Sequence, residues 1–198
     1  MWNDRFATAD YVFGKEPAAF LVDHASWLTP GARGLSVADG EGRNAVFMAE
    51  RGVETVAMDA SENAISKARA LAQERGVEVA FHRADIFDWD WTPEAFDLVV
   101  AVFIQFLAPA ARSAIFAGMV QTLKPGGVLL LHGYTPEQIA HGTGGPGVPE
   151  NLYTEALLRE SFAGLEIVEL RAYEREIREG VGHSGLSALI DLVARKPL

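Results

Sequence analysis

The chain of 198 residues contains no cysteine, which excludes disulfides, thiolate metal sites and a cysteine nucleophile. Basic residues are scarce, since 17 lysines and arginines face 27 acidic residues and give a formal net charge of −10. No basic run is dense enough to bind a phosphate backbone, so nucleic acid is not expected as a partner. No apolar stretch is long enough to span a membrane, and charges at Asp4 and Arg5 exclude an N-terminal hydrophobic leader. We therefore expect a cytoplasmic protein without a membrane partner.

Histidine pairs at metal-ligand spacing are also missing, because the five histidines are isolated and the carboxylates are scattered. The sequence therefore predicts no metal site. A composition of 49% hydrophobic and 22% charged residues fits one globular domain with a full core. We expect a single domain over residues 1–198, divided into an N-terminal cap or lid with its helix (1–30), a core (34–133), a glycine- and proline-rich loop (134–151) and a C-terminal helix with strands (152–198).

Strand-like and helix-like segments alternate along most of the chain, which predicts an α/β fold with a mostly parallel sheet and helices on both faces. The segment Thr135–Asn151 breaks this alternation and predicts a mobile loop without regular elements. Two later segments, Leu165–Ala172 and Leu186–Ala194, predict an antiparallel pair at the sheet edge. The other expected strands are 35–38, 54–58, 77–82, 96–103 and 128–132, and the expected helices are 16–28, 44–51, 61–73, 112–123 and 154–162, with a turn at Lys124–Gly127.

The stretch Gly34–Asn44, with the sequence GLSVADGEGRN, has the pattern of a buried strand, a tight glycine turn and a helix start. Gly40 and Gly42 allow the backbone to approach a ligand where a Cβ would collide. The N–H groups of the following helix favour a carboxylate or a phosphate, and Asp39 adds a carboxylate at the edge of the turn. The same letters satisfy the G-x-G-x-x-A pattern of dinucleotide-binding proteins, so this loop alone does not name a cofactor.

Acidic residues follow the next two strands. Asp59 ends the second expected strand, where a carboxylate can accept hydrogen bonds from both hydroxyls of a ribose. Asp85 follows the third strand, where it can take the exocyclic amine of an adenine while Ile86 packs on the ring. Either acid alone is equally compatible with a solvated turn or a helix N-cap. Because the carboxyl ends of parallel strands meet at one edge of a sheet, the combination favours an adenosine-containing cofactor.

Four motifs together, GEGRN, MDAS, RADIFD and LKPGGVLLL, resemble those of class I S-adenosylmethionine-dependent methyltransferases. The segments FGKEP, GTGGP and EGVGHSG extend this resemblance to the thiopurine and tellurite-resistance methyltransferase group. The resemblance implies a Rossmann-like fold, S-adenosylmethionine as cofactor and S-adenosylhomocysteine as product. It places Gly40 and Gly42 at the methionyl part, Asp59 at the ribose, Asp85 at the adenine amine, and the backbone of Val102 and Phe103 at the methionyl amino group. The complete set of expected cofactor residues is Asp39, Gly40, Gly42, Asn44, Asp59, Ala60, Asp85, Ile86, Val102 and Phe103.

Three residues depart from the family pattern: Ser36 stands where an acid is common, and Ala38 and Asp39 stand where a Gly-Cys or Gly-Ala pair is common. We expect Ala38 to be tolerated because that position need not have a positive φ. These departures leave open a non-catalytic protein that only binds the cofactor. A nicotinamide-dependent oxidoreductase is the second alternative, although it leaves RADIFD and the LKPGG turn without a role.

Methyl transfer from a sulfonium needs alignment and exclusion of water, and a general base only when the nucleophile is protonated. Gln105 follows the fourth strand together with Phe103 and Phe106, and it is a candidate hydrogen-bond partner for the acceptor. Core packing is the simpler interpretation for Phe106. His183, His132 and Tyr134 are candidate bases or ligands, with a structural histidine as the alternative. The family resemblance suggests a small, soft acceptor such as a thiol, a selenol or a tellurium oxyanion derivative, and the oligomeric state stays open.

Overall fold

The computed structural model describes residues 2–198, so Met1, the first residue of the expected N-terminal cap, lies outside the described residues. The chain forms two compact units, which we describe separately. Unit 1 comprises the chain up to Asp90 together with Glu179–Gly182, and unit 2 comprises Trp91–Arg178 with His183–Leu198. The expectation of a single domain stays a prediction.

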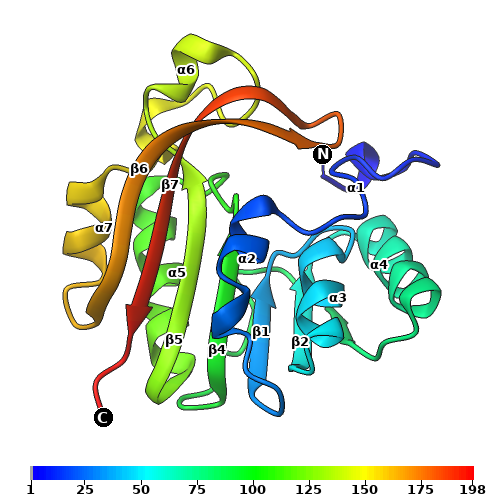
Figure 1. The fold of residues 1–198 in the computed structure, drawn as a ribbon, viewed down its shortest axis with the longest axis horizontal. Coiled ribbons are helices and arrows are strands. Elements are labelled where there is room, and N and C mark those ends of the chain that lie inside the picture. The colour runs from blue at the N-terminus through cyan, green and yellow to red at the C-terminus, as the bar shows by residue number, and fades with distance from the viewer. Residues whose placement is uncertain (1) are drawn as a thin grey trace. The chain divides into compact units, whose positions relative to one another are not determined.

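Unit 1 contains a parallel sheet with the strand order β3-β2-β1. Leu35 pairs with Val56, and Met58 pairs with His82, so the carboxyl ends of the three strands lie at the same edge. Helix α3 runs beside β2 and packs against α4 (Figure 1). The elements of unit 1 are α1 (Trp2–Arg5), α2 (Ala19–Asp23), a 3₁₀ helix (Ala25–Trp27), β1 (Arg33–Val37), α3 (Arg43–Glu50), β2 (Glu54–Asp59), α4 (Glu62–Arg75) and β3 (Ala80–Arg83).

Both ends of α4 have the caps that the sequence predicts. The Ser61 side chain accepts a hydrogen bond from the Ala64 N–H, and Gly76 ends the helix in the left-handed conformation. The predicted helix over residues 16–28 is wrong, because α2 begins only at Ala19 and a 3₁₀ turn follows it. Side chains elsewhere in unit 1 accept from the Ala18 and Ala19 N–H groups, and Ala18 stays extended with ψ 136°. These contacts delay the first helical turn.

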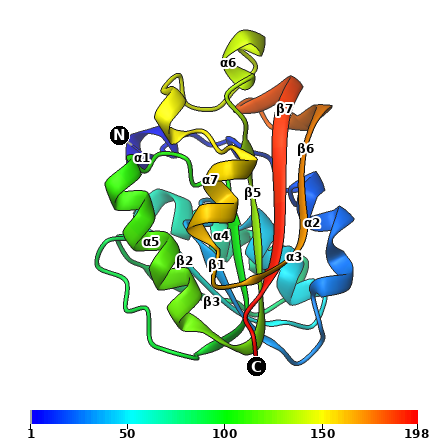
Figure 2. The same cartoon turned by 90° about the vertical axis from the view of Figure 1, so that its left-hand side faces the viewer.

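Unit 2 contains four strands in the order β4-β5-β7-β6. Strand β5 is parallel to β4 and antiparallel to β7, which confirms the antiparallel C-terminal strand. Helices α5 and α7 lie on the same side of β5 and β7 (Figure 2), and the Phe116 ring of α5 packs on Phe162 at 4.8 Å. The elements of unit 2 are β4 (Phe96–Val102), α5 (Pro109–Thr122), β5 (Leu123–Tyr134), α6 (Gln138–His141), a 3₁₀ helix (Pro149–Asn151), α7 (Glu155–Ser161), β6 (Glu166–Glu179) and β7 (His183–Arg195).

The predicted turn at Lys124–Gly127 lies inside β5, so its placement outside a strand is wrong. Phe96 pairs with Leu123 and Leu98 pairs with Val128, so the β5 side of the ladder holds extra residues at this point. Gly126 has φ +77°, which lets the chain bulge out and return to the ladder.

The segment Thr135–Asn151 contains α6 and a 3₁₀ helix, so the prediction that it lacks regular elements is wrong. The buried Gln138 side chain donates to Thr143 Oγ1 and to the Gly144 carbonyl, and it accepts from the Ala188 N–H. Because Ala188 belongs to β7, this single amide fastens the loop to a strand. Figure 2 shows α6 beyond the ends of β5 and β7.

Candidate active site

The glycine turn of unit 1 begins at Ala38, which has φ +48°. The expectation that this position does not need a positive φ is therefore wrong. The left-handed residue turns the chain so that the Asp39 N–H donates to the Met58 carbonyl of β2 at 3.0 Å. An L-residue with a side chain is strained in this conformation, which persists where the surroundings over-determine it.

Asp39 has a carboxylate oxygen that is enclosed and unused. Its Oδ1 accepts from the Ser36 hydroxyl at 2.5 Å and from the Ala45 N–H at 3.2 Å. Its Oδ2 is buried and has no hydrogen-bond partner among residues 2–198. Burial raises the pKa of the Asp39 carboxyl from 3.8 to about 7, and the nearby Asp59 acts in the same direction. An enclosed acceptor of this kind suits a cationic group of a ligand.

Glycine is required at positions 40 and 42 of the turn for different structural reasons. The Gly40 N–H donates to Asp59 Oδ2 at 2.9 Å, and its φ is +63°. A Cβ on Gly42 would lie 2.7 Å from the Ala68 backbone of α4, so packing between α3 and α4 already requires this glycine. Asn44 is also occupied, since its Oδ1 accepts from the Ala18 N–H at 2.9 Å. The structure thus ties Gly42 and Asn44, both expected at the cofactor, to neighbouring segments.

The two acids at the carboxyl ends of β2 and β3 have different environments. Asp59 is buried, its Oδ1 accepts from the Ser61 N–H at 2.8 Å, and burial raises its pKa. Asp85 is exposed and its Oδ1 accepts from the Phe87 N–H at 3.0 Å. The Asp59–Arg83 register pairing places both acids at the edge where the glycine turn lies. Ala60 is exposed and Ile86 is buried.

Phe103 follows β4 in unit 2 and has φ +57°, which is strained for an aromatic residue. Its N–H donates to the His132 carbonyl at 2.9 Å, and Val102 pairs with His132 in the ladder. Its ring stacks on the His183 imidazole with centroids 4.3 Å apart. It also contacts the rings of Tyr134 at 4.6 Å and His132 at 4.7 Å. Phe103 therefore lies at the centre of a ring cluster that contains all three candidate bases.

Two buried hydrogen-bonded pairs flank this phenylalanine. The Tyr134 hydroxyl and His183 Nδ1 lie 2.5 Å apart. His132 and Asp191 are opposite each other on β5 and β7, and the Asp191 carboxylate accepts from His132 Nδ1 at 2.6 Å. Both pairs are almost completely enclosed, since the four residues are 1–8% exposed. The arrangement can hold a proton at a defined position in each pair.

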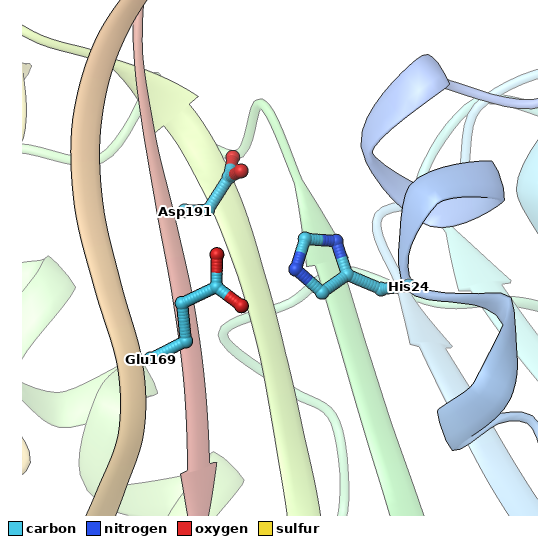
Figure 3. A group of neighbouring side chains, drawn as sticks. All are labelled: His24, Glu169 and Asp191. Atoms are coloured by element: carbon cyan, nitrogen blue, oxygen red, sulfur yellow. The ribbon is translucent and has the colours of Figure 1, made fainter.

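Asp191 was not predicted from the sequence. It also accepts from the Tyr173 hydroxyl at 3.2 Å and forms an ion pair with Arg171 at 3.4 Å. Figure 3 shows Asp191 on β7 and Glu169 on the adjacent β6 in unit 2, and His24 after α2 in unit 1. The available signal was a lone acid in the apolar run ALIDLVA. The prediction that the protein has no metal site stays a prediction.

Gln105 is buried and directed at the backbone of Tyr134. Its Oε1 accepts from the Tyr134 N–H at 2.6 Å, and its Nε2 donates to the Tyr134 carbonyl at 2.9 Å. The amide therefore holds β5 where Tyr134 enters the ring cluster. Phe106 is 41% exposed, so its interpretation as a core residue is wrong.

Comparison with known proteins identifies the class of protein that this fold and site define. Residues 35–127 match the model of the family described as a methyltransferase domain. Thiocyanate methyltransferase 1 of Arabidopsis thaliana is 30% identical over 173 residues, which are 85% of this chain and 74% of that protein. The chain therefore belongs to the class I S-adenosylmethionine-dependent methyltransferase family. An uncharacterized methyltransferase of Synechocystis is 29% identical over 52% of this chain, which spans 48% of the length of that relative.

Solved structures show the same fold over nearly the whole chain. TehB from Haemophilus influenzae has a TM-score of 0.73 at 20% identity, and the match covers 90% of this chain and 62% of TehB. The N-methyltransferase NodS from Bradyrhizobium japonicum has a TM-score of 0.69 at 17% identity and covers 90% of this chain and 97% of NodS. These likenesses confirm the predicted α/β Rossmann-like methyltransferase fold, which has seven strands within residues 2–198 and antiparallel strands near the C-terminus.

Membership of this family confirms three expectations from the sequence. The protein is an S-adenosylmethionine-dependent methyltransferase, its cofactor is S-adenosylmethionine and its product is S-adenosylhomocysteine. The alternative of a nicotinamide-dependent oxidoreductase is thereby overturned. Among residues 2–198, none of the helices is long and apolar enough to cross a membrane.

Proposed function

We propose that this methyltransferase acts on a small, soft nucleophile whose reacting atom is sulfur, selenium or tellurium. The observation that carries the proposal is the Tyr134–His183 hydrogen bond of 2.5 Å beside the stacked ring of Phe103. An apolar ring next to a proton acceptor suits a small thiol or selenol. The thiocyanate methyltransferase relative also supports a soft sulfur acceptor. A net charge of −10 opposes polyanionic substrates such as nucleic acid.

In this proposal, unit 1 holds the cofactor through residues at the carboxyl ends of β1, β2 and β3. Asp59 takes the ribose, Asp85 and Ile86 take the adenine, and the Gly40 turn takes the methionyl part. The residues fit a cationic amino acid moiety because Asp39 Oδ2 is buried and has no partner within residues 2–198. When bound, the cofactor supplies an electrophilic methyl group on a sulfonium.

His183 is the proposed base for an acceptor that arrives protonated. Its Nδ1 shares a hydrogen bond with the Tyr134 hydroxyl, and this contact fixes the orientation of the ring. In the tautomer that acts as base, Nδ1–H donates to the Tyr134 oxygen and Nε2 takes the proton. His132 is the second candidate base, but it is 2% exposed and its Nδ1 is held by Asp191. In our proposal His132 and Gln105 position Phe103 and Tyr134, and the ring cluster excludes water from the acceptor.

Two acceptors, of which only one must lose a proton to react, test this function. We would measure methyl transfer from S-adenosylmethionine to 2-mercaptoethanol, which is mainly protonated at pH 7, and to thiocyanate, which has no proton to lose. In wild type the thiol rate should rise with pH through the histidine range. His183→Ala should lower the thiol rate about 10²-fold and remove that rise, because a positioned base contributes on this order. The thiocyanate rate should fall much less.

The matched control is His141→Ala, because this histidine lies in α6 and pairs with the exposed Glu174. It should preserve the thiol rate and its pH profile. Full thiol activity with an unchanged pH profile in both His183→Ala and His132→Ala would contradict the base assignment and favour an acceptor that is already ionised. Binding of S-adenosylhomocysteine without methylation of thiols, selenols, tellurium oxyanions or thiocyanate would contradict the acceptor class.

A further inference from the structure

Glu41, between the two glycines of the turn, is a buried carboxylate directed at the N-terminal segment. It is 2% exposed. Its Oε2 accepts from the Val12 N–H at 2.8 Å and from the Phe13 N–H at 3.3 Å. Its Oε1 pairs with the Lys67 ammonium of α4 at 2.8 Å. One side chain of the cofactor turn thus binds two backbone amides from a segment about 28 residues earlier in the chain.

Lys67 extends this contact along the same segment. Its ammonium also donates to the Asp10 carbonyl at 2.7 Å, and the Tyr11 hydroxyl donates to the Lys67 carbonyl at 2.9 Å. Residues 10–13 are therefore held by Glu41 from the turn and by Lys67 from α4. Hydrogen bonds to a charged partner contribute more than neutral ones, and the bond between Glu41 and the Val12 N–H is buried.

The preceding part of the segment reaches both loops that the proposed cofactor would contact. A Cβ built on Gly40 would lie 3.6 Å from the Phe6 ring, so this ring lies beside the turn. Asn3 Oδ1 accepts from the Ser61 hydroxyl at 3.0 Å, directly after Asp59 and Ala60. Phe6 is 3% exposed and belongs to an apolar cluster with Val12, Phe13 and Ala64. The N-terminal segment is therefore built against the Gly40 turn and the Asp59 loop.

The turn at residues 179–182 rests on the same anchored residues. The Val12 carbonyl accepts from the N–H groups of Val181 and Gly182 at 3.0 and 3.3 Å. Glu179 accepts from the Ala19 N–H and forms a buried ion pair with Arg43 at 2.8 Å. His183, the proposed base, follows this turn directly in the sequence.

We propose that Glu41 is a positioning residue that holds residues 10–13 as a rigid, preformed side of the cofactor site. Only residues 2–9 then move when the cofactor binds. The proposal rests on the cofactor placement given under the proposed function. The two parts of the segment differ in their contacts. Residues 10–13 bind the charged side chains of Glu41, which is buried, and Lys67. In contrast, Asn3 makes neutral hydrogen bonds to Ser61 and Asn63, partly in contact with solvent. Removal of the Glu41 carboxylate frees residues 10–13 and lowers the fraction of protein that is competent to bind the cofactor.

The test is calorimetric titration with S-adenosylhomocysteine, combined with hydrogen exchange of the free and bound protein. Glu41→Ala should raise the dissociation constant about tenfold, because the apparent affinity falls with the competent fraction. Glu41→Gln keeps acceptors for Val12 and Phe13 but loses the charge, and it should have an intermediate effect. In free wild type the Val12 and Phe13 amides should exchange slowly, and in Glu41→Ala they should exchange fast. The bound wild type should gain protection mainly in residues 2–9.

Lys15→Met is the matched control, because Lys15 joins the same segment to α4 through an exposed ion pair with Glu74. It should leave both the affinity and the exchange pattern unchanged. Wild-type affinity in Glu41→Ala with a lowered melting temperature would show a merely structural role and overturn the proposal. Ligand-dependent protection at residues 10–13 equal to that at residues 2–9 would also overturn it. Failure of wild type to bind S-adenosylhomocysteine would instead count against the proposed function.

Discussion

Asp59 and Asn44 of unit 1 make hydrogen bonds to backbone amides, whereas His183 and His132 of unit 2 bond to other side chains. Asp59 accepts from the Gly40 and Ser61 amides, and Asn44 accepts from the Ala18 amide. In unit 2, His183 pairs with Tyr134, and His132 pairs with Asp191. Backbone contacts fix the shape of a binding site, whereas paired titratable side chains fix the position of a proton. The difference indicates that unit 1 determines cofactor affinity and unit 2 determines acceptor chemistry.

The largest expected effect tests whether the glycine turn is a packed structure. Gly42→Ala should lower the free energy of unfolding by about 2–4 kcal/mol, because the methyl group collides with Ala68 and φ is positive. Denaturant unfolding measures this loss. Gly76→Ala is the control, since Gly76 has φ +69° with nothing within 4 Å of its Cβ, and it should cost only about 1 kcal/mol. Equal losses in the two variants would contradict a packing role for Gly42.

A smaller effect concerns the proton on Asp39, whose pKa is raised to about 7 mainly by burial. If the cofactor's cation needs the ionised carboxylate, the affinity for S-adenosylhomocysteine should rise up to about tenfold between pH 6 and 8. Asp59 raises this pKa and Arg43 lowers it. Calorimetry of wild type and Asp39→Asn measures the difference, and the variant should lack the pH dependence. The same pH dependence in the variant would assign the titration to another group.

The same carboxyl has a consequence for stability. The folded chain binds the proton more tightly than the unfolded chain, whose pKa is near 3.8. The contribution of Asp39 to stability is therefore fully present below pH 3.8 and is lost as the pH rises toward 7. At pH 8, Asp39→Asn should unfold at a higher denaturant concentration than wild type. A lower midpoint at that pH would contradict the account.

The smallest expected effect tests whether a change in unit 2 alters the reaction with the acceptor and leaves the cofactor affinity unchanged. Tyr134→Phe removes the hydroxyl that holds His183 and should lower the thiol rate about three- to tenfold, the amount expected for one hydrogen bond. The ratio of the thiol rate to the thiocyanate rate measures this change, because the amount of folded protein cancels in the ratio. Tyr173→Phe, which removes another hydroxyl of unit 2, should leave that ratio unchanged. A weaker affinity for S-adenosylhomocysteine in Tyr134→Phe would contradict the proposal that unit 1 alone determines cofactor affinity.

Local signals predicted the parts of the fold that depend on neighbouring residues. Ser61 and Gly76 cap α4 as predicted, because capping is decided within a few residues. The predicted helix over residues 16–28 failed because distant side chains, Asn44 and Glu179, compete for its first amides. The strand containing Gly126 was shortened in the prediction because a bulge and a turn share the same glycine-rich sequence.

For the candidate site, too, the sequence predicted the features that depend on chain order but not those that depend on distant contacts. The acids that follow the strands could be located from the sequence, because parallel strands bring their carboxyl ends together. The positive φ of Ala38 and Phe103 was not predictable, since neither residue type favours that conformation. Asp191 was missed because its pairing with His132 depends on the register of β5 and β7, which are 59 residues apart at this point.

The most direct test of the proposed division is a calorimetric titration of S-adenosylhomocysteine into wild type, Asp59→Ala and His183→Ala at one pH. Asp59→Ala should lose about 1–3 kcal/mol of binding free energy, because charged hydrogen bonds to the ligand disappear. His183→Ala should bind as tightly as wild type. Unchanged affinity in Asp59→Ala, or an equal loss in both variants, would contradict the assignment of cofactor binding to unit 1.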